Sequence, residues 1–236
     1  EMEFDRIYAE VDLGRIEENM KAMKEHLRPG TKMYGVVKTD AYGHGAVPVA
    51  RTIDRFVCGY AVATVDEGLK LRRHGIEKEI LCLGPVSAGR YQECLENDIS
   101  LPMFEYRRAK ELSDAAVAEG KTAKIHIAVD TGMSRIGLFP DEGSVETVKE
   151  IAELPALRIA GMFTHFARAD EADKTKAGEQ YRRFHAFCDA GKAAGVEVPI
   201  CHCSNSAGIA EIREANMDMV RAEVGGPSGL RKTMSA

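Results

Sequence analysis

The chain has 236 residues, of which 44% are hydrophobic and 29% are charged, as in a soluble globular protein with one large domain or two small ones. A net charge of −5 without a long basic run argues against nucleic acid or an anionic membrane surface as a partner. No apolar run approaches the roughly 20 residues that span a bilayer, and the first residues lack signal-peptide character. The six cysteines then fit reduced thiols better than a disulfide framework, so we expect a cytoplasmic protein.

Strand and helix patterns alternate along almost the whole chain. Short apolar and β-branched runs predict strands at 7–13, 32–37, 60–63, 80–83, 101–103, 124–129, 158–164, 200–203 and 217–220. Amphipathic patterns predict helices between them, at 15–27, 46–53, 66–73, 106–118, 145–154 and 176–194.

Without the first run, eight strands alternate with helices, which predicts a parallel (β/α)8 barrel (a TIM barrel) in one domain. An open doubly wound sheet is the runner-up, but the Gly-x-Gly-x-x-Gly turn that would usually follow its first strand does not occur there. We expect residues 1–222 to form the barrel with an N-terminal strand, and the Gly-rich residues 223–236 to form an irregular tail.

Lys38 follows the buried run 33–37 and precedes a loop with two glycines, Gly43 and Gly45. A lysine at that junction lies half out of water, which favours the neutral amine that attacks carbonyl groups. Such an amine can form a Schiff base, although a lysine after a strand is often only a surface residue. Tyr42, in the same loop, could donate to a phosphate oxygen or simply pack.

Further candidates follow later strands, at the barrel face where reactive residues gather. The turn Asp130-Thr-Gly leads to Arg135, whose guanidinium could be held near an anion, and His165 ends the sixth barrel strand in Gly161-Met-Phe-Thr-His-Phe. A histidine there could be a base, a metal ligand or a flat stacking surface, or a core residue bonded to the backbone.

The seventh strand ends in Cys201-His-Cys, followed by Ser204-Asn-Ser. A metal site is disfavoured, because His202 points to the face opposite the two thiols and no second Cys/His pair completes four ligands. Small hydroxyls and free backbone N–H groups at the start of a helix suit a phosphate better.

Five strings, in this order, resemble those of the alanine racemase family: YAEVDL, VVKTDAYGHG, DTGMSRIG, GMFTHF and CSNSA with DMVR. Jointly they are specific and cover nearly all of the chain to Ala222. The resemblance implies pyridoxal 5'-phosphate (PLP) as cofactor, with Lys38 as its Schiff-base lysine and as a catalytic base. It implies that Arg135 contacts the phenolic oxygen of PLP and that His165 packs beside its ring.

The resemblance also assigns residues that hold the cofactor. Asn205 and Ser206 would bind its phosphate, to which Tyr42 could also donate from its loop. Arg221, in Met217-Asp-Met-Val-Arg, would face the pyridine nitrogen. Because a guanidinium only donates, that nitrogen would remain an unprotonated acceptor and a weaker electron sink.

The family implies an activity as well. It would be interconversion of L- and D-alanine, with serine as the other candidate substrate, and it would supply a D-amino acid for peptidoglycan. The family forms a homodimer whose second domain contributes a tyrosine base. The chain looks truncated before that domain, so we expect little activity from it alone; the alternative is a non-catalytic, single-domain PLP-binding protein. Two positions depart from the family pattern: Ala128 stands where many members carry a lysine that supports the Arg135 position, and Glu223 would put a carboxylate near the phosphate.

Overall fold

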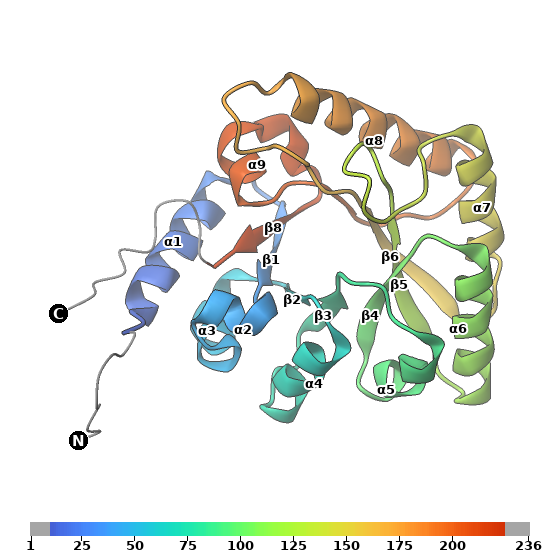
Figure 1. Cartoon of the computed structure of the whole chain (residues 1–236), viewed down its shortest axis with the longest axis horizontal. Coiled ribbons are helices and arrows are strands. Elements are labelled where there is room, and N and C mark those ends of the chain that lie inside the picture. Colours follow the sequence, from blue (N-terminus) through green and yellow to red (C-terminus); the bar gives the residue numbers. More distant parts are fainter. Residues whose placement is uncertain (1–9, 225–236) are drawn as a thin grey trace.

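A computed structural model describes residues 10–224. Eight parallel strands close into a barrel in sequence order, each pairing with the next and the last with the first (Figure 1). They are β1 (Lys32–Val36), β2 (Gly59–Val62), β3 (Glu79–Cys82), β4 (Ile99–Met103), β5 (Ala123–Ala128), β6 (Leu157–Phe163), β7 (Cys201–His202) and β8 (Met219–Glu223). The predicted (β/α)8 barrel is confirmed, and the open sheet is wrong.

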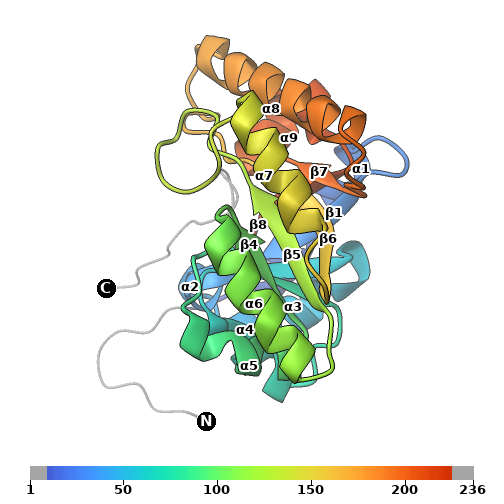
Figure 2. The ribbon, with the colours of Figure 1, turned by 90° about the vertical axis from the view of Figure 1, so that its right-hand side faces the viewer.

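The helices surround this barrel in chain order, with α6 and α7 along the outer side of β5 and β6 (Figure 2). They are α1 (Leu13–His26), α2 (Lys38–Gly43), α3 (Ala46–Ile53), α4 (Val65–Arg73), α5 (Tyr91–Glu96), α6 (Tyr106–Ala118), α7 (Glu142–Ala152), α8 (Thr175–Ala193) and α9 (Ser206–Glu211). Single 3-10 turns occur at Asp54–Phe56, Ala88–Arg90 and Arg213–Asn216. None of the helices in the described part of the chain is long and apolar enough to span a bilayer.

Local chemistry explains where several helices begin. Thr64 and Glu67 form a reciprocal capping box at α4, and the side chains of Asp12 and Asp141 accept backbone N–H groups at α1 and α7. α5, with six residues, was not predicted because it is too short to show a helical period, and α2 was not predicted because its residues 39–42 form a left-handed turn.

Two predictions fall at the ends of the chain. Residues 7–9 of the strand predicted over 7–13 lie outside the described residues; the described remainder is not a strand, since residues 10–12 have no regular structure and Leu13 begins α1. Glu223 is the last residue of β8, whereas the expected tail from 225 onward lies outside the described residues. The eighth strand therefore begins at Met219 and ends three residues later than predicted.

Successive side chains of each strand point to opposite sides of the barrel wall, which produces two cores. The larger one lies between barrel and helices. A smaller cluster, including Tyr34, Leu81 and Met219, fills part of the barrel interior. The interior also holds fully buried polar side chains, among them His126 and His202.

Candidate active site at the barrel mouth

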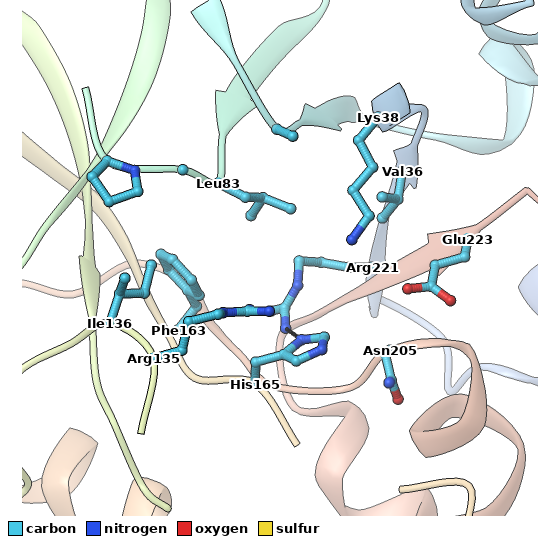
Figure 3. Close-up of a pocket in the computed structure, with 13 residues that line it drawn as sticks. Val36, Lys38, Leu83, Arg135, Ile136, Phe163, His165, Asn205, Arg221 and Glu223 are labelled. Atoms are coloured by element: carbon cyan, nitrogen blue, oxygen red, sulfur yellow. Dashed lines mark hydrogen bonds between the residues drawn. The ribbon is translucent and has the colours of Figure 1, made fainter. Parts of the chain in front are cut away.

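A cavity of about 260 Å³ opens at the carboxyl ends of the strands (Figure 3). Its lining includes five of the seven site residues predicted from the sequence: Lys38, Arg135, His165, Asn205 and Arg221. The apolar part of the wall comes from Val36, Leu83, Pro85, Ile136 and Phe163. An amine and two guanidinium groups therefore share a small, partly apolar cavity.

Lys38 comes directly after β1 and Val37, and in Figure 3 its side chain points into the cavity. The next four residues, 39–42, all have positive φ values between 51° and 57°, a left-handed turn that costs roughly 1–2 kcal/mol per residue outside glycine. Hydrogen bonds hold this turn: Asp40 Oδ1 accepts from the Ala46 N–H at 2.9 Å, and Glu67 Oε1 accepts from the Thr39 N–H at 2.7 Å. The turn fixes the direction in which the chain leaves Lys38.

Tyr42 ends that turn and lies at the rim rather than in the cavity lining, with its ring 5.8 Å from Nζ of Lys38. Burial raises the pKa of its hydroxyl, and the neighbouring carboxylate of Glu223 raises it further. Tyr42 is therefore a neutral hydrogen-bond donor.

Arg221 is the most constrained cation of the site, with 3% of its surface exposed. Nη1 bonds to Nδ1 of His202 at 2.7 Å, and Nη2 donates to the Thr164 carbonyl at 2.8 Å. Nε makes no hydrogen bond with a described residue and remains as a donor. Burial lowers the pKa of Arg221 to about 10, so the guanidinium stays protonated at neutral pH.

His165 lies beside Arg221, with its Nδ1 3.3 Å from Nη2. Because a guanidinium only donates, Nδ1 accepts and the ring proton resides on Nε2. Burial lowers the pKa of His165 to about 3, assisted by the positive charges of Arg221 and Arg135. The imidazole is thus a neutral donor through Nε2.

Arg135 reaches the cavity from the loop after β5 and is exposed. No described residue forms a hydrogen bond or ion pair with it. Ala128, buried at the end of β5, offers it no support, as its departure from the family pattern led us to expect. A guanidinium in this state is available to an anionic ligand.

Asn205 lines the cavity, and its side chain caps α9 by accepting the Gly208 N–H at 3.1 Å. Ser206 is buried beside the cavity, where its hydroxyl accepts the Glu223 N–H at 2.8 Å and keeps its own proton to donate. Glu223 itself lines the cavity and is the only carboxylate among the described lining residues.

Three contributors were not predicted as site residues. His202 bonds to Arg221, His126 bonds to His202, and the Phe163 ring stacks on His202 with ring centres 5.3 Å apart. For the two histidines, the sequence offered one signal: each is a single polar residue at an inward position of an apolar strand. Along β7 the alternation places His202 inward, while Cys203 donates to the Ala215 carbonyl. Within the described ranges no group of three or more potential ligands could hold a metal ion.

Fold and site together define a parallel (β/α)8-barrel protein. At the carboxyl ends of its strands it has a positively charged site for a small ligand. Residues 11–222 match the family described as alanine racemase, N-terminal domain, and the chain belongs to this family. The alanine racemases of Clostridium novyi and Methanococcus maripaludis are 44% and 41% identical to it over 216 residues. A Clostridium difficile alanine racemase structure, in complex with cycloserine, superposes with a TM-score of 0.93 at 35% identity.

These alignments cover most of the chain but only part of each relative. They include 91% of the chain against 56% of the Clostridium novyi protein and 58% of the Methanococcus maripaludis protein. The structural match covers 98% of the chain and 64% of the Clostridium difficile protein. The chain thus spans little more than half the length of these curated relatives.

Proposed function

We propose that this barrel binds PLP and serves an amino-acid racemase that interconverts L- and D-alanine, with serine as a second possible substrate. Family membership supports the reaction class, and the similar racemase in complex with cycloserine supports a small amino-acid-like substrate. The observation that carries the proposal is the convergence of Lys38, Arg135 and Arg221 on one cavity with apolar walls.

The donor set fits the cofactor in most respects. Lys38 supplies the amine for its carbonyl carbon, and Nε of Arg221 supplies a donor for its ring nitrogen. Asn205, the Ser206 hydroxyl and Tyr42 would hold its phosphate. Glu223 is the one group that opposes a phosphate, since like charges repel.

When bound, PLP draws electrons from the substrate and makes the proton on Cα acidic. Lys38 would take that proton at Nζ on one face of Cα. Arg221 keeps its own protons and therefore does not protonate the ring. Nε2 of His165 offers a neutral N–H within the same wall.

Inversion at Cα also requires a proton to return on the opposite face. The other titratable groups of the described lining are engaged: guanidinium groups keep their protons, Nδ1 of His165 accepts from Arg221, and Glu223 lies against Tyr42. We therefore assign the second proton-transfer group to residues outside 10–224 or to a partner subunit. This observation also favours the second candidate function, a PLP-binding protein without turnover.

The cellular role follows from the reaction. We propose that the product D-amino acid enters peptidoglycan, that the protein acts in the cytoplasm, and that it forms a homodimer. The cysteines in the described part of the chain are unpaired, which agrees with a reducing compartment.

The decisive experiment is chemical labelling. PLP is added, the protein is reduced with borohydride, and the modified peptide is mapped. We expect a visible absorption band at roughly 420 nm, a property of the bound cofactor, and a pyridoxyl group on Lys38 that is lost in Lys38→Ala.

Lys32→Ala, at the exposed opposite end of the same strand, is the matched control and should label normally. A label on another lysine, or none, would overturn the proposal. Label without alanine or serine turnover after the relatives' remaining segment is added would favour the second candidate.

A further inference from the structure

Four polar side chains cross the interior of the barrel from its amino end to its mouth. We call Glu79, His126, His202 and Arg221 the polar column. Both imidazoles are fully buried, and Glu79, at the start of β3, keeps 28% of its side chain exposed. Arg221 at the upper end lines the cavity, whereas the lower three residues do not.

The distances join neighbouring members into a chain. His202 Nδ1 lies 2.7 Å from Nη1 of Arg221, and its Nε2 lies 2.9 Å from Nδ1 of His126. Nε2 of His126 then lies 3.6 Å from Oε1 of Glu79, which is longer than a hydrogen bond. Among the described residues, no other atom forms a hydrogen bond with this Nε2. The last contact is thus the longest of the three, with Nε2 of His126 facing the Glu79 carboxylate.

The chemistry of Arg221 determines where each proton resides. A guanidinium has no acceptor, so Nδ1 of His202 must be bare. Burial, together with the charge of Arg221, lowers the pKa of His202 well below its ordinary value, so this ring is neutral and its only proton is on Nε2. That proton is donated to Nδ1 of His126, which leaves the His126 proton on Nε2, facing Glu79.

The Glu79 end of the column favours the same order. Burial alone would raise the pKa of Glu79, but the donor groups that face it, from His126, Tyr34 and Ser100, lower it to about 2. An ionised carboxylate only accepts, so it favours the proton of His126 on Nε2. Ser100 donates to the same oxygen at 2.9 Å and fixes its position. Donors along the whole column therefore point toward Glu79.

Packing restricts the positions of the two ring planes. Phe163 stacks on His202 with an angle of 18° between the rings. Gly161 leaves the space that His126 occupies, since a Cβ there would lie 2.7 Å from its Nδ1.

We propose that Glu79 and His126 are positioning residues that act through His202 to hold the Arg221 guanidinium in a single orientation at the cavity. The inference rests on the proposed function in one respect, namely that Arg221 presents Nε to the ring nitrogen of PLP. If the acceptor at Glu79 is removed, the His126 proton loses its partner. If that proton moves to Nδ1 of His126, it faces the proton on Nε2 of His202. His202 must then change its own protonated nitrogen, which weakens its hydrogen bond with Arg221.

The test compares two variants. Glu79→Met removes the acceptor but keeps a side chain of similar length, and Glu79→Gln keeps an acceptor but loses the charge. Nitrogen NMR of the histidine rings reports which nitrogen is protonated, and the Nη–H signals of Arg221 report how firmly the guanidinium is held. We expect Nε2–H on both rings in the wild type and in Glu79→Gln. In Glu79→Met we expect mixed forms of His126 and weakened Arg221 signals. Glu77→Met, an exposed glutamate two residues earlier, is the control.

Each other outcome overturns the inference. A proton on Nδ1 of His202 in the wild type would contradict it, whether or not the Met variant folds. Unchanged rings and Arg221 signals in Glu79→Met would show that Glu79 does not act on the column. Loss of the pattern in Glu79→Gln would contradict the role of Glu79 as the acceptor for the His126 proton.

PLP binding is measured separately by fluorescence titration. Loss of one well-placed hydrogen bond to a charged group predicts about tenfold weaker binding in Glu79→Met and roughly twofold or less in Glu79→Gln. Equal affinities of all variants would refute the positioning role. If the wild type bound no PLP but kept the predicted protonation pattern, the proposed function would fail while the column remained established.

Discussion

At the residue scale, the site combines groups of very different predictability. Lys38, Arg135, His165 and Arg221 belong to strings that resemble a known family, and all four line one cavity. His126 carried no such signal. Its place depends on a contact with His202, 76 residues later in the chain, which no local pattern encodes.

Glu223 opposes the phosphate that we assign to this cavity, so its charge should weaken PLP binding. We predict that Glu223→Gln binds PLP roughly fivefold more tightly, in line with removal of one nearby like charge at a partly screened site. Equilibrium titration of PLP against both proteins measures this. Glu18→Gln, on the exposed side of α1, should leave the affinity unchanged. Weaker binding in Glu223→Gln would mean that the carboxylate organises Tyr42 for the ligand instead.

The Glu79 carboxylate should make the protein acid-sensitive in a defined range. Its pKa is lowered from 4.5 to about 2 in the folded protein, so its contribution is present above pH 4.5 and is lost as the pH falls toward 2. The shift corresponds to a loss of about 3 kcal/mol at most. Urea unfolding at a series of acidic pH values should show a shallower decline for Glu79→Gln than for the wild type. Parallel curves would contradict this origin.

At the element scale, alternation and apolar runs located all eight barrel strands, because a buried parallel strand is a short apolar segment whatever its neighbours are. The left-handed turn at 39–42 was not predicted. None of its four residues is glycine, and the turn depends on the Glu67 side chain from α4 and on the first N–H of α3. Tertiary contacts overrode the local preference there.

Gly161 in β6 offers a test of how closely the strands approach the column. An added Cβ would meet His126 and the Ile200 carbonyl at 2.7–2.9 Å, too close for either to accept without moving. We predict that Gly161→Ala lowers the free energy of unfolding by roughly 2 kcal/mol and disturbs the protonation pattern of His126.

Gly178→Ala is the matched control for that substitution. Its Cβ would contact only a flexible Arg182 side chain within α8. The helix should gain up to about 1 kcal/mol, because alanine forms helices better than glycine. Urea unfolding of both variants measures the difference. Equal effects in the two variants would show that the space around His126 is not filled as described.

At the scale of the whole molecule, barrel closure brings residues at the ends of β1, β6 and β8, in the β5–α7 loop and at the cap of α9 to one mouth. The described lining supplies Lys38 as the base for one face of a substrate Cα. We predict that the 236 residues alone bind PLP but racemise alanine at least about a hundredfold more slowly than when the relatives' remaining segment is added, since one proton-transfer step contributes on the order of 10²–10⁴-fold. A coupled assay for D-alanine measures this. Full activity of the chain by itself would locate both proton-transfer groups within it.

The sequence by itself determined the strand and helix order, the closed parallel barrel, the family, and the lysine at the end of the first barrel strand. These depend on local periodicity and on contiguous strings, which any stretch of chain displays before it folds. Only the tertiary structure decided the left-handed exit from Lys38, the place of Glu223 in the cavity, and the polar column beneath Arg221. Those features join residues from different strands, and hydrogen-bond direction inside a barrel depends on which side chains closure brings face to face.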